Sequence, residues 1–149
     1  GARMHHVKLH GALYNQSAVD PVLAAAACRA IADVNPSLHV LGLSGSLFLQ
    51  VAASQGLRPV AEVFADRHYT DAATLVPREQ PGALIDETEE AVAQALQLVC
   101  RQSVNTLSGK TIAIKAESVC VHGDGPHAVD FAKQLHRALT QLSIRIQPV

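Results

Sequence analysis

The chain has 149 residues, of which 48% are hydrophobic and 17% charged, and its formal net charge is −1. These values are ordinary for a globular core, and we expect residues 1–149 to form a single domain. The 12 Lys and Arg residues are scattered, which argues against a nucleic-acid-binding protein, and no apolar run approaches the ~20 residues of a membrane span. The three cysteines are far apart and odd in number, which favours a reducing cytoplasm over a disulfide scaffold.

Short apolar runs alternate with helical patterns along the chain, as in proteins built from repeated β-then-α units. The first predicted strand, 5–15, precedes a helix that Asp20 caps and that has Pro21 in its first turn. The second strand, 39–45, leads into a short helix for which Ser46 is the candidate cap. The apolar stripe predicted for the first helix comprises Val22, Leu23, Ala27, Ala30, Ile31 and Val34.

The third predicted strand, 59–66, is followed by an unusually long irregular stretch, 67–85. Loops of this length are usually functional or disordered. A capping box from Asp86 to Glu89 predicts the start of the next helix.

The remaining segments predict a hairpin, a strand, a helix and a last short strand. Residues 103–116 favour a hairpin that turns at Ser108 and Gly109, and 117–123 form the fourth main strand. The segment 144–146 offers the last strand. One face of the intervening helix is expected to carry Ala128, Ala132, Leu135, Leu139 and Leu142.

Four βα units with right-handed crossovers predict an α/β fold with a parallel sheet. Four units are too few to close a barrel, so we expect a partial barrel with open sheet edges. Ligands of parallel α/β folds bind at the carboxyl ends of the strands. The polar residues at these ends are Lys8, His10, Ser44, Glu62, Asp66, Arg67, His122 and Asp124.

The lysine of the first strand and two carboxylates of the third are the main charged candidates. Lys8 needs a partner or a ligand, because an isolated buried ammonium is very costly. A salt bridge to Glu62 would satisfy it as well as a ligand would, so both roles stay open. Glu62 and Asp66 share one strand face and could act as a general base or as Mg²⁺ ligands. Strand alternation places His6 and His10 on the same face as Lys8.

The pattern His122-x-Asp124-x-x-His127 has the residue types of a metal site, although its spacing is only weakly diagnostic. Asp124 precedes Gly125 and Pro126, where a helix N-cap belongs, so it could cap the helix, take part in chemistry or do both. His122, at the strand end, is either a satisfied core histidine or a functional one.

Three segments of the chain resemble signature segments of the LamB/YcsF family. They are HVKLHGALYNQ (6–16), EVFADRHYTD with LVPREQPGALI (62–85), and SVCVHGDGPHAV (118–129), in the family's order and across nearly the whole chain. Leu9 stands where the family usually has proline. Family members are longer, with further residues before the point where this chain begins. The resemblance therefore implies the C-terminal part of a β/α barrel similar to polysaccharide deacetylases and certain glycoside hydrolases.

The resemblance also implies an activity, ATP-dependent hydrolysis of 5-oxo-L-proline to L-glutamate by a cytoplasmic enzyme with partner subunits B and C. ATP would phosphorylate the lactam carbonyl oxygen and so turn a poor electrophile into one that water attacks. The site must then neutralise phosphate and stabilise a tetrahedral intermediate. By resemblance, the candidate catalytic residues are Lys8, His10, Glu62, Asp66, His122 and Asp124. The candidate phosphate partners are Arg67 and Arg78, beside ATP and a divalent metal such as Mg²⁺.

Two other functions fit the same residues. A metal-dependent amide hydrolase similar to the deacetylases would need no ATP. A non-catalytic subunit would leave the chemistry to its partners. We expect the 149-residue chain to have no 5-oxoprolinase activity alone, and to self-associate or pair with the missing part of the barrel through its open sheet edges.

Overall fold

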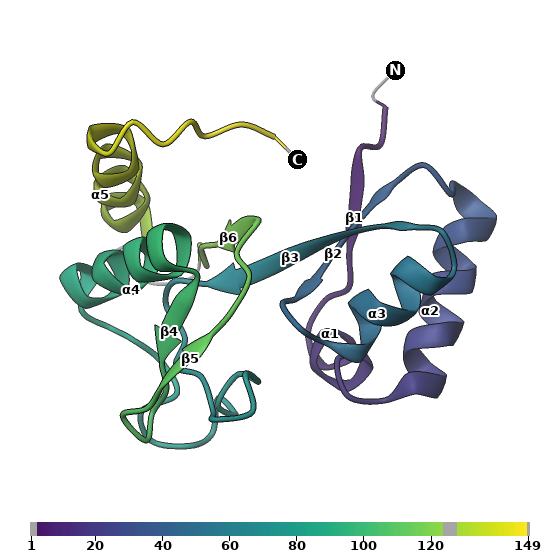
Figure 1. Ribbon diagram of the computed structural model, residues 1–149, viewed down its shortest axis with the longest axis horizontal. Helices are drawn as coiled ribbons and strands as arrows, with labels where there is room; N and C mark the ends of the chain where they lie inside the picture. The colour runs from purple at the N-terminus through teal and green to yellow at the C-terminus, as the bar shows by residue number, and fades with distance from the viewer. Residues whose placement is uncertain (1–2, 124–127, 149) are drawn as a thin grey trace. The chain divides into compact units, whose positions relative to one another are not determined.

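The computed structural model describes residues 3–123 and 128–148. The chain divides into two compact units, one ending at Glu62 and the other running from Val63 to Pro148 (Figure 1). That residues 1–149 form a single domain stays a prediction. In chain order the elements are β1 (His6–Lys8), α1 (Ala12–Ser17), α2 (Pro21–Val34), β2 (His39–Leu43), α3 (Leu47–Ser54), β3 (Arg58–Phe64), α4 (Thr88–Arg101), β4 (Ser103–Asn105), β5 (Thr111–Ala113), β6 (Ser118–Cys120) and α5 (Ala128–Gln141).

The first unit is a parallel sheet with helices packed against it. β2 pairs in parallel with β1 and with β3, as predicted for βα units. α2 and α3 lie side by side in Figure 1 and share one apolar core with β2 and β3. The approach of α3 to the sheet is close. A Cβ atom on Gly42 would lie 2.8 Å from Phe48 Cδ1 and 2.9 Å from Leu49 Cδ2, so glycine is the residue that fits there.

The first predicted strand is wrong beyond its first residues. β1 ends at Lys8, and the chain then turns at Gly11, whose φ of 59° lies in the left-handed region that glycine adopts readily. Helix α1 follows and buries Tyr14 and Ser17. The alternation that placed His10 on the face of Lys8 therefore stops before it reaches His10.

The cap of α2 is confirmed, but its predicted apolar stripe is partly wrong. Asp20 Oδ1 accepts hydrogen bonds from the backbone N–H groups of the next helical turn at 2.8 and 3.1 Å. Val22 and Val34 are 77% and 69% exposed. The helix is apolar on more than one side, and the core contains Ala24 and Cys28 together with Ile31 of the predicted stripe. The buried residues are Ala24, Cys28 and Ile31.

In the second unit, α4 and α5 pack through one apolar cluster. β6 lies next to the end of β3, where Ala65 N donates to Cys120 O at 3.4 Å. β4 and β5 form the predicted hairpin, with Gly109 at a φ of 87° in its turn. None of the helices within the described residues combines the length and hydropathy needed to cross a membrane.

Two predictions in this unit are wrong. α4 begins at Thr88 with Glu87 as its N-cap and without a side-chain cap bond, so the Asp86 to Glu89 capping box does not form. Acidic residues in the first turn still favour this end of the helix through its dipole. The segment 144–146 is irregular rather than a strand.

The buried face of α5 agrees with the predicted one at Leu135 and Leu139 and differs from it elsewhere. It carries Phe131, Leu135 and Leu139, whereas Ala132 and Leu142 are exposed. Turning Phe131 inward instead of Ala132 removes more apolar area from water.

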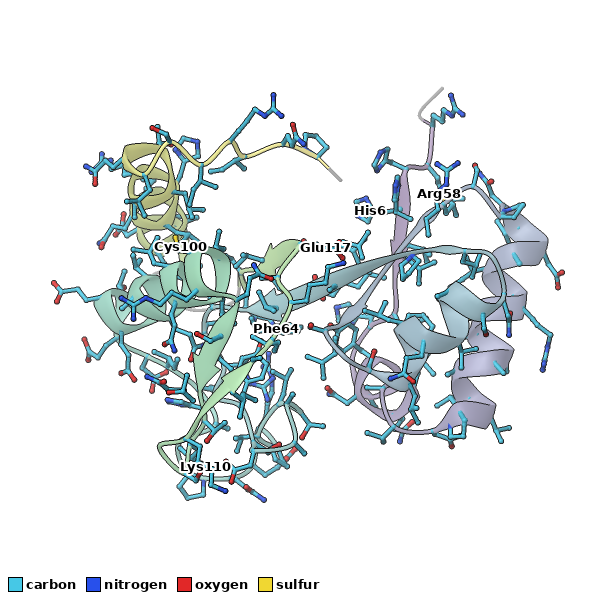
Figure 2. The ribbon with its side chains drawn as sticks, in the orientation of Figure 1. His6, Arg58, Phe64, Cys100, Lys110 and Glu117 are labelled. Atoms are coloured by element: carbon cyan, nitrogen blue, oxygen red, sulfur yellow. The ribbon has the colours of Figure 1, made fainter. Side chains whose placement is uncertain are left out.

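The long loop that follows β3 is fastened to the β4–β5 hairpin by one carboxylate. Asp71 Oδ1 accepts hydrogen bonds from Thr106 Oγ1 at 2.7 Å and from Ser108 Oγ at 2.6 Å. Its Oδ2 lies 2.7 Å from Lys110 Nζ, at the hairpin turn labelled in Figure 2. The Lys110 ammonium and the two hydroxyls hold the pKa of Asp71 well below its usual range, and Asp71 in turn raises the pKa of Lys110.

This anchor predicts how stability depends on pH. Because its folded-state pKa is depressed, the Asp71 carboxylate stabilises the fold above its ordinary pKa of 3.8, and that stabilisation is lost as pH falls through the folded-state value. We expect Asp71→Asn to lower the urea midpoint at neutral pH and to lose less stability than the wild type on acidification. Urea unfolding followed by circular dichroism at about pH 7 and about pH 2.5 measures both effects.

Glu117→Gln is the matched control. Glu117 lies 2.6 Å from Lys115, and the side chains of this pair are 39% and 67% exposed, against 40% and 68% for Asp71 and Lys110. This ion pair joins residues only two positions apart, and exposed pairs of this kind stabilise little. Equal losses in the two variants would show that Asp71 is an ordinary surface charge.

Candidate active site

In the first unit, a buried carboxylate receives two donors from distant segments. Glu62 is 3% exposed, and its Oε1 lies 2.8 Å from Lys8 Nζ. Its Oε2 accepts a hydrogen bond from Tyr14 Oη at 2.9 Å. The register explains the ion pair: Lys8 is opposite Leu41 and Glu62 is opposite Leu43, two positions on one face of β2, so the side chains meet across that strand. The predicted Lys8–Glu62 salt bridge is therefore present.

Tyr14 is a residue of this cluster that sequence reasoning missed. Its ring lies under the Lys8 ammonium, with 5.4 Å from Nζ to the ring centroid, and its hydroxyl reaches Glu62. Both contacts depend on the turn at Gly11 and on helix α1, a segment that the apolar pattern predicted as strand. The available signal was the glycine itself, since a glycine inside an apparent strand often marks a bend.

In the second unit, Asp66 and His122 form a short contact. His122 Nδ1 lies 2.7 Å from Asp66 Oδ2, and the His122 backbone N–H donates to the same oxygen at 3.4 Å. The imidazole stacks on Phe64, labelled at the end of β3 in Figure 2, with 5.7 Å between ring centroids and an interplanar angle of 23°. The side chains of His122 and Asp66 are 28% and 19% exposed, so the pair is reachable from solvent.

This arrangement fixes which imidazole nitrogen can react. An ionised carboxylate only accepts hydrogen bonds, so Nδ1 carries the proton in this contact, and in the neutral ring Nε2 keeps its lone pair. The buried Oδ1 of Asp66 has no hydrogen-bond partner within residues 3–123 and 128–148. A histidine oriented by a carboxylate through Nδ1 is suited to accept a proton, or to bind a ligand, at Nε2.

The predicted phosphate partner Arg67 is used inside the long loop. Its guanidinium is 4% exposed and donates to the backbone carbonyls of Val76 and Ala83. Burial lowers the pKa of Arg67, and the neighbouring Arg78 lowers it further. These contacts favour a structural role for Arg67. Arg78 itself is exposed.

The other predicted site residues are not joined to these clusters by the described contacts. His10 is exposed and lies beyond β1. Asp124 and His127 fall in 124–127, outside the described residues, so the choice between a cap and a chemical role for Asp124 stays a prediction.

The described residues do not fit a divalent metal or a phosphate cradle. Both oxygens of Glu62 are engaged, and no group of three or more His, Cys, Asp or Glu side chains converges within the described ranges. The stretch from Ser108 to Thr111, which resembles the end of a phosphate-binding loop, is a hairpin turn whose Lys110 pairs with Asp71. Of the described side chains, the Asp66–His122 pair is arranged for acid–base chemistry.

Comparisons with known proteins agree with the predicted resemblance. The model of the LamB/YcsF family matches residues 1–149. The chain is 49% identical over 146 residues to the A subunit of 5-oxoprolinase from Histophilus somni (strain 129Pt), covering 98% of this chain and 59% of the relative. It is 48% identical over 147 residues to the protein of the same name from Bordetella parapertussis, covering 99% and 58%. The chain thus spans about three fifths of the length of these curated relatives.

A solved structure supports the fold. The crystal structure of a lactam utilization protein from Thermus thermophilus matches with a TM-score of 0.90 and 35% identity, over 99% of this chain and 58% of that one. This match confirms the predicted α/β fold class, with parallel strands and alternating helices that correspond to part of a β/α barrel.

The Glu62 cluster leads to a stability prediction. Tyr14→Phe removes a hydrogen bond to a buried charge, and we expect it to lower the free energy of unfolding by about 1.5–3 kcal/mol. In a Glu62→Gln background the same change should cost at least ~0.5 kcal/mol less, because the charge that strengthens the bond is gone. Urea unfolding of the two single variants, the double variant and the wild type completes the cycle. Strictly additive losses would show that the hydroxyl does not stabilise the carboxylate.

Proposed function

The chain belongs to the LamB/YcsF family, and from this membership we propose that it is part of the A subunit of a 5-oxoprolinase. The proposed reaction is ATP-dependent hydrolysis of 5-oxo-L-proline to L-glutamate in the cytoplasm, together with subunits B and C. The name shared by relatives at 46–49% identity supports the activity, and the letter in that name supports a multisubunit enzyme.

The observation that carries the proposal is the Asp66–His122 pair. A five-membered lactam is a stable amide, so its hydrolysis needs an activated carbonyl and a base for the attacking water. ATP supplies the activation by phosphorylating the carbonyl oxygen, and no described side chain is assigned to that step. His122 Nε2 then takes a proton from water as the oxygen bonds to the carbonyl carbon. The C–N bond breaks, the imidazolium returns the proton to the nitrogen that becomes the amino group of glutamate, and the former carbonyl carbon is left as an acyl phosphate. A second water hydrolyses this acyl phosphate to the side-chain carboxylate of glutamate and inorganic phosphate.

In this mechanism Asp66 has a different role from the one the sequence suggested. Its contact with Nδ1 makes it the group that orients the base and stabilises the imidazolium, rather than the base itself.

The proposal predicts the effect of two substitutions in the full-length protein when it is assayed together with subunits B and C. We expect His122→Gln and Asp66→Asn each to lower kcat at least ~100-fold, the scale of general-base catalysis, with folding largely retained. The measurement is ATP-dependent release of glutamate from 5-oxoproline. His5→Gln is the control, since His5 is exposed and contacts His6 and His39 rather than the site.

Three outcomes separate the alternatives. Near-normal rates in both variants would refute the assignment of the base. Amide hydrolysis that needs a divalent metal but no ATP would identify the deacetylase-like enzyme instead. Full activity of subunits B and C without this protein would make it non-catalytic.

A further inference from the structure

Gln94 is a buried side chain of α4 that touches the segment carrying Asp66. It is 9% exposed. Its Nε2 lies 3.0 Å from Phe64 O, 3.1 Å from Ala65 O and 2.9 Å from Arg67 O. One amide thus contacts three carbonyls within four consecutive residues, at the point where the chain leaves β3.

The orientation of this amide is fixed by its surroundings. All three partners are carbonyl oxygens, which only accept hydrogen bonds, so the nitrogen and not the oxygen of the amide must face them. Its two N–H bonds are shared among the three acceptors. Buried carbonyls without a donor are costly, so the N–H groups of Gln94 help to satisfy the carbonyls at the end of β3 and just beyond it.

The segment that Gln94 holds contains two residues that contact the His122 ring. Phe64 stacks on the imidazole, and Asp66 accepts from its Nδ1. A second side chain binds the same segment, here as an acceptor. Tyr69 Oη accepts a hydrogen bond from Phe64 N at 2.7 Å. Tyr69 is fully buried, so this anchor is rigid. With both anchors in place, the backbone on either side of Asp66 has little freedom.

We propose that Gln94 is a positioning residue of this site. It fixes the backbone from Phe64 to Arg67 and thereby holds Asp66 against His122. Its effect on rate rests on the proposed function, whereas its effect on the His122 imidazole does not.

The test uses Gln94→Glu, which keeps the shape of the side chain but replaces the donor by a carboxyl group. The ionised carboxylate faces three carbonyl oxygens and repels them, whereas the protonated form can donate one hydrogen bond. Burial among acceptors raises the pKa of the new carboxyl above the ordinary value of about 4.3. A raised folded-state pKa means that the native arrangement is kept at low pH and lost as pH rises through that value.

Two measurements follow. In the full-length protein with subunits B and C, we expect Gln94→Glu to lower kcat by about 10- to 100-fold at about pH 8, with little change in KM, and the ratio to wild type to recover toward about pH 5. Gln94→Leu, which cannot titrate, should show a loss of similar size without recovery. In the full-length protein without its partners, ¹⁵N NMR of the imidazole should show that His122 Nδ1 loses its hydrogen-bonded proton in Gln94→Glu at the higher pH and regains it at the lower.

Other titratable groups near this position require a matched control. Asp66, Arg67 and His122 lie in or against the held segment, and Glu90, one helical turn before Gln94, lies 3.7 Å from His68. Gln97→Glu introduces the same charge one turn further along α4, where the native Nε2 donates to Asn105 Oδ1 at 3.1 Å, away from this segment. The control should keep wild-type kcat and wild-type His122 signals at both pH values.

The outcomes separate this proposal from the proposed function. If no variant and no wild type hydrolyses 5-oxoproline, the proposed function fails, and the His122 signals still decide the role of Gln94. Gln94 variants that lose thermal stability but keep wild-type His122 signals would overturn the proposal. If Gln94→Leu does not fold, two other measurements test the role of Gln94. They are the behaviour of Gln94→Glu at about pH 5 and the exchange protection of the Gln94 side-chain amide in the wild type. Rapid exchange of that amide would count against the proposal.

Discussion

A carboxylate that is buried on folding needs hydrogen-bond donors in place of water, and the structure around β3 depends on this constraint. Glu62, in the strand, draws in Lys8 from β1 and Tyr14 from α1. Asp66, just beyond the strand, draws in His122 from the segment after β6. Neither partner set is local in sequence. Each carboxylate therefore gathers polar side chains within its own unit. The contacts that stabilise the unit are also the ones that position its candidate reactive groups.

Backbone groups at the end of β3 and in the following loop also bond to side chains. The amide of Gln94 donates to three carbonyls, the hydroxyl of Tyr69 accepts from one N–H, and the guanidinium of Arg67 donates to two carbonyls of the loop. Further along, Asp71 joins the loop to the β4–β5 hairpin. A long loop can thus hold one conformation without regular structure, because side chains bond to its backbone and join it to the hairpin.

Local patterns in the sequence predicted those elements that have a strong local signal and no alternative structure of similar stability. The cap at Asp20, the buried strand β2 and the hairpin at Gly109 all form as expected. The predictions failed where two local solutions have similar energy. An alanine-rich helix such as α2 can bury either of two faces, and the stretch after Lys8 is apolar enough to resemble a strand although Gly11 turns it into α1.

The sequence by itself determined the fold class, the family and the set of reactive residue types, because hydrophobic periodicity and ordered motifs are written along the chain. It also anticipated that Lys8 and Glu62 could pair. Only the tertiary structure decided how the groups combine: that Asp66 contacts Nδ1 of His122, that Tyr14 shares Glu62 with Lys8, and that Arg67 serves the loop. Hydrogen bonds act over about 3 Å and depend on direction, and residues more than 50 positions apart reach that distance only once the strands are in register.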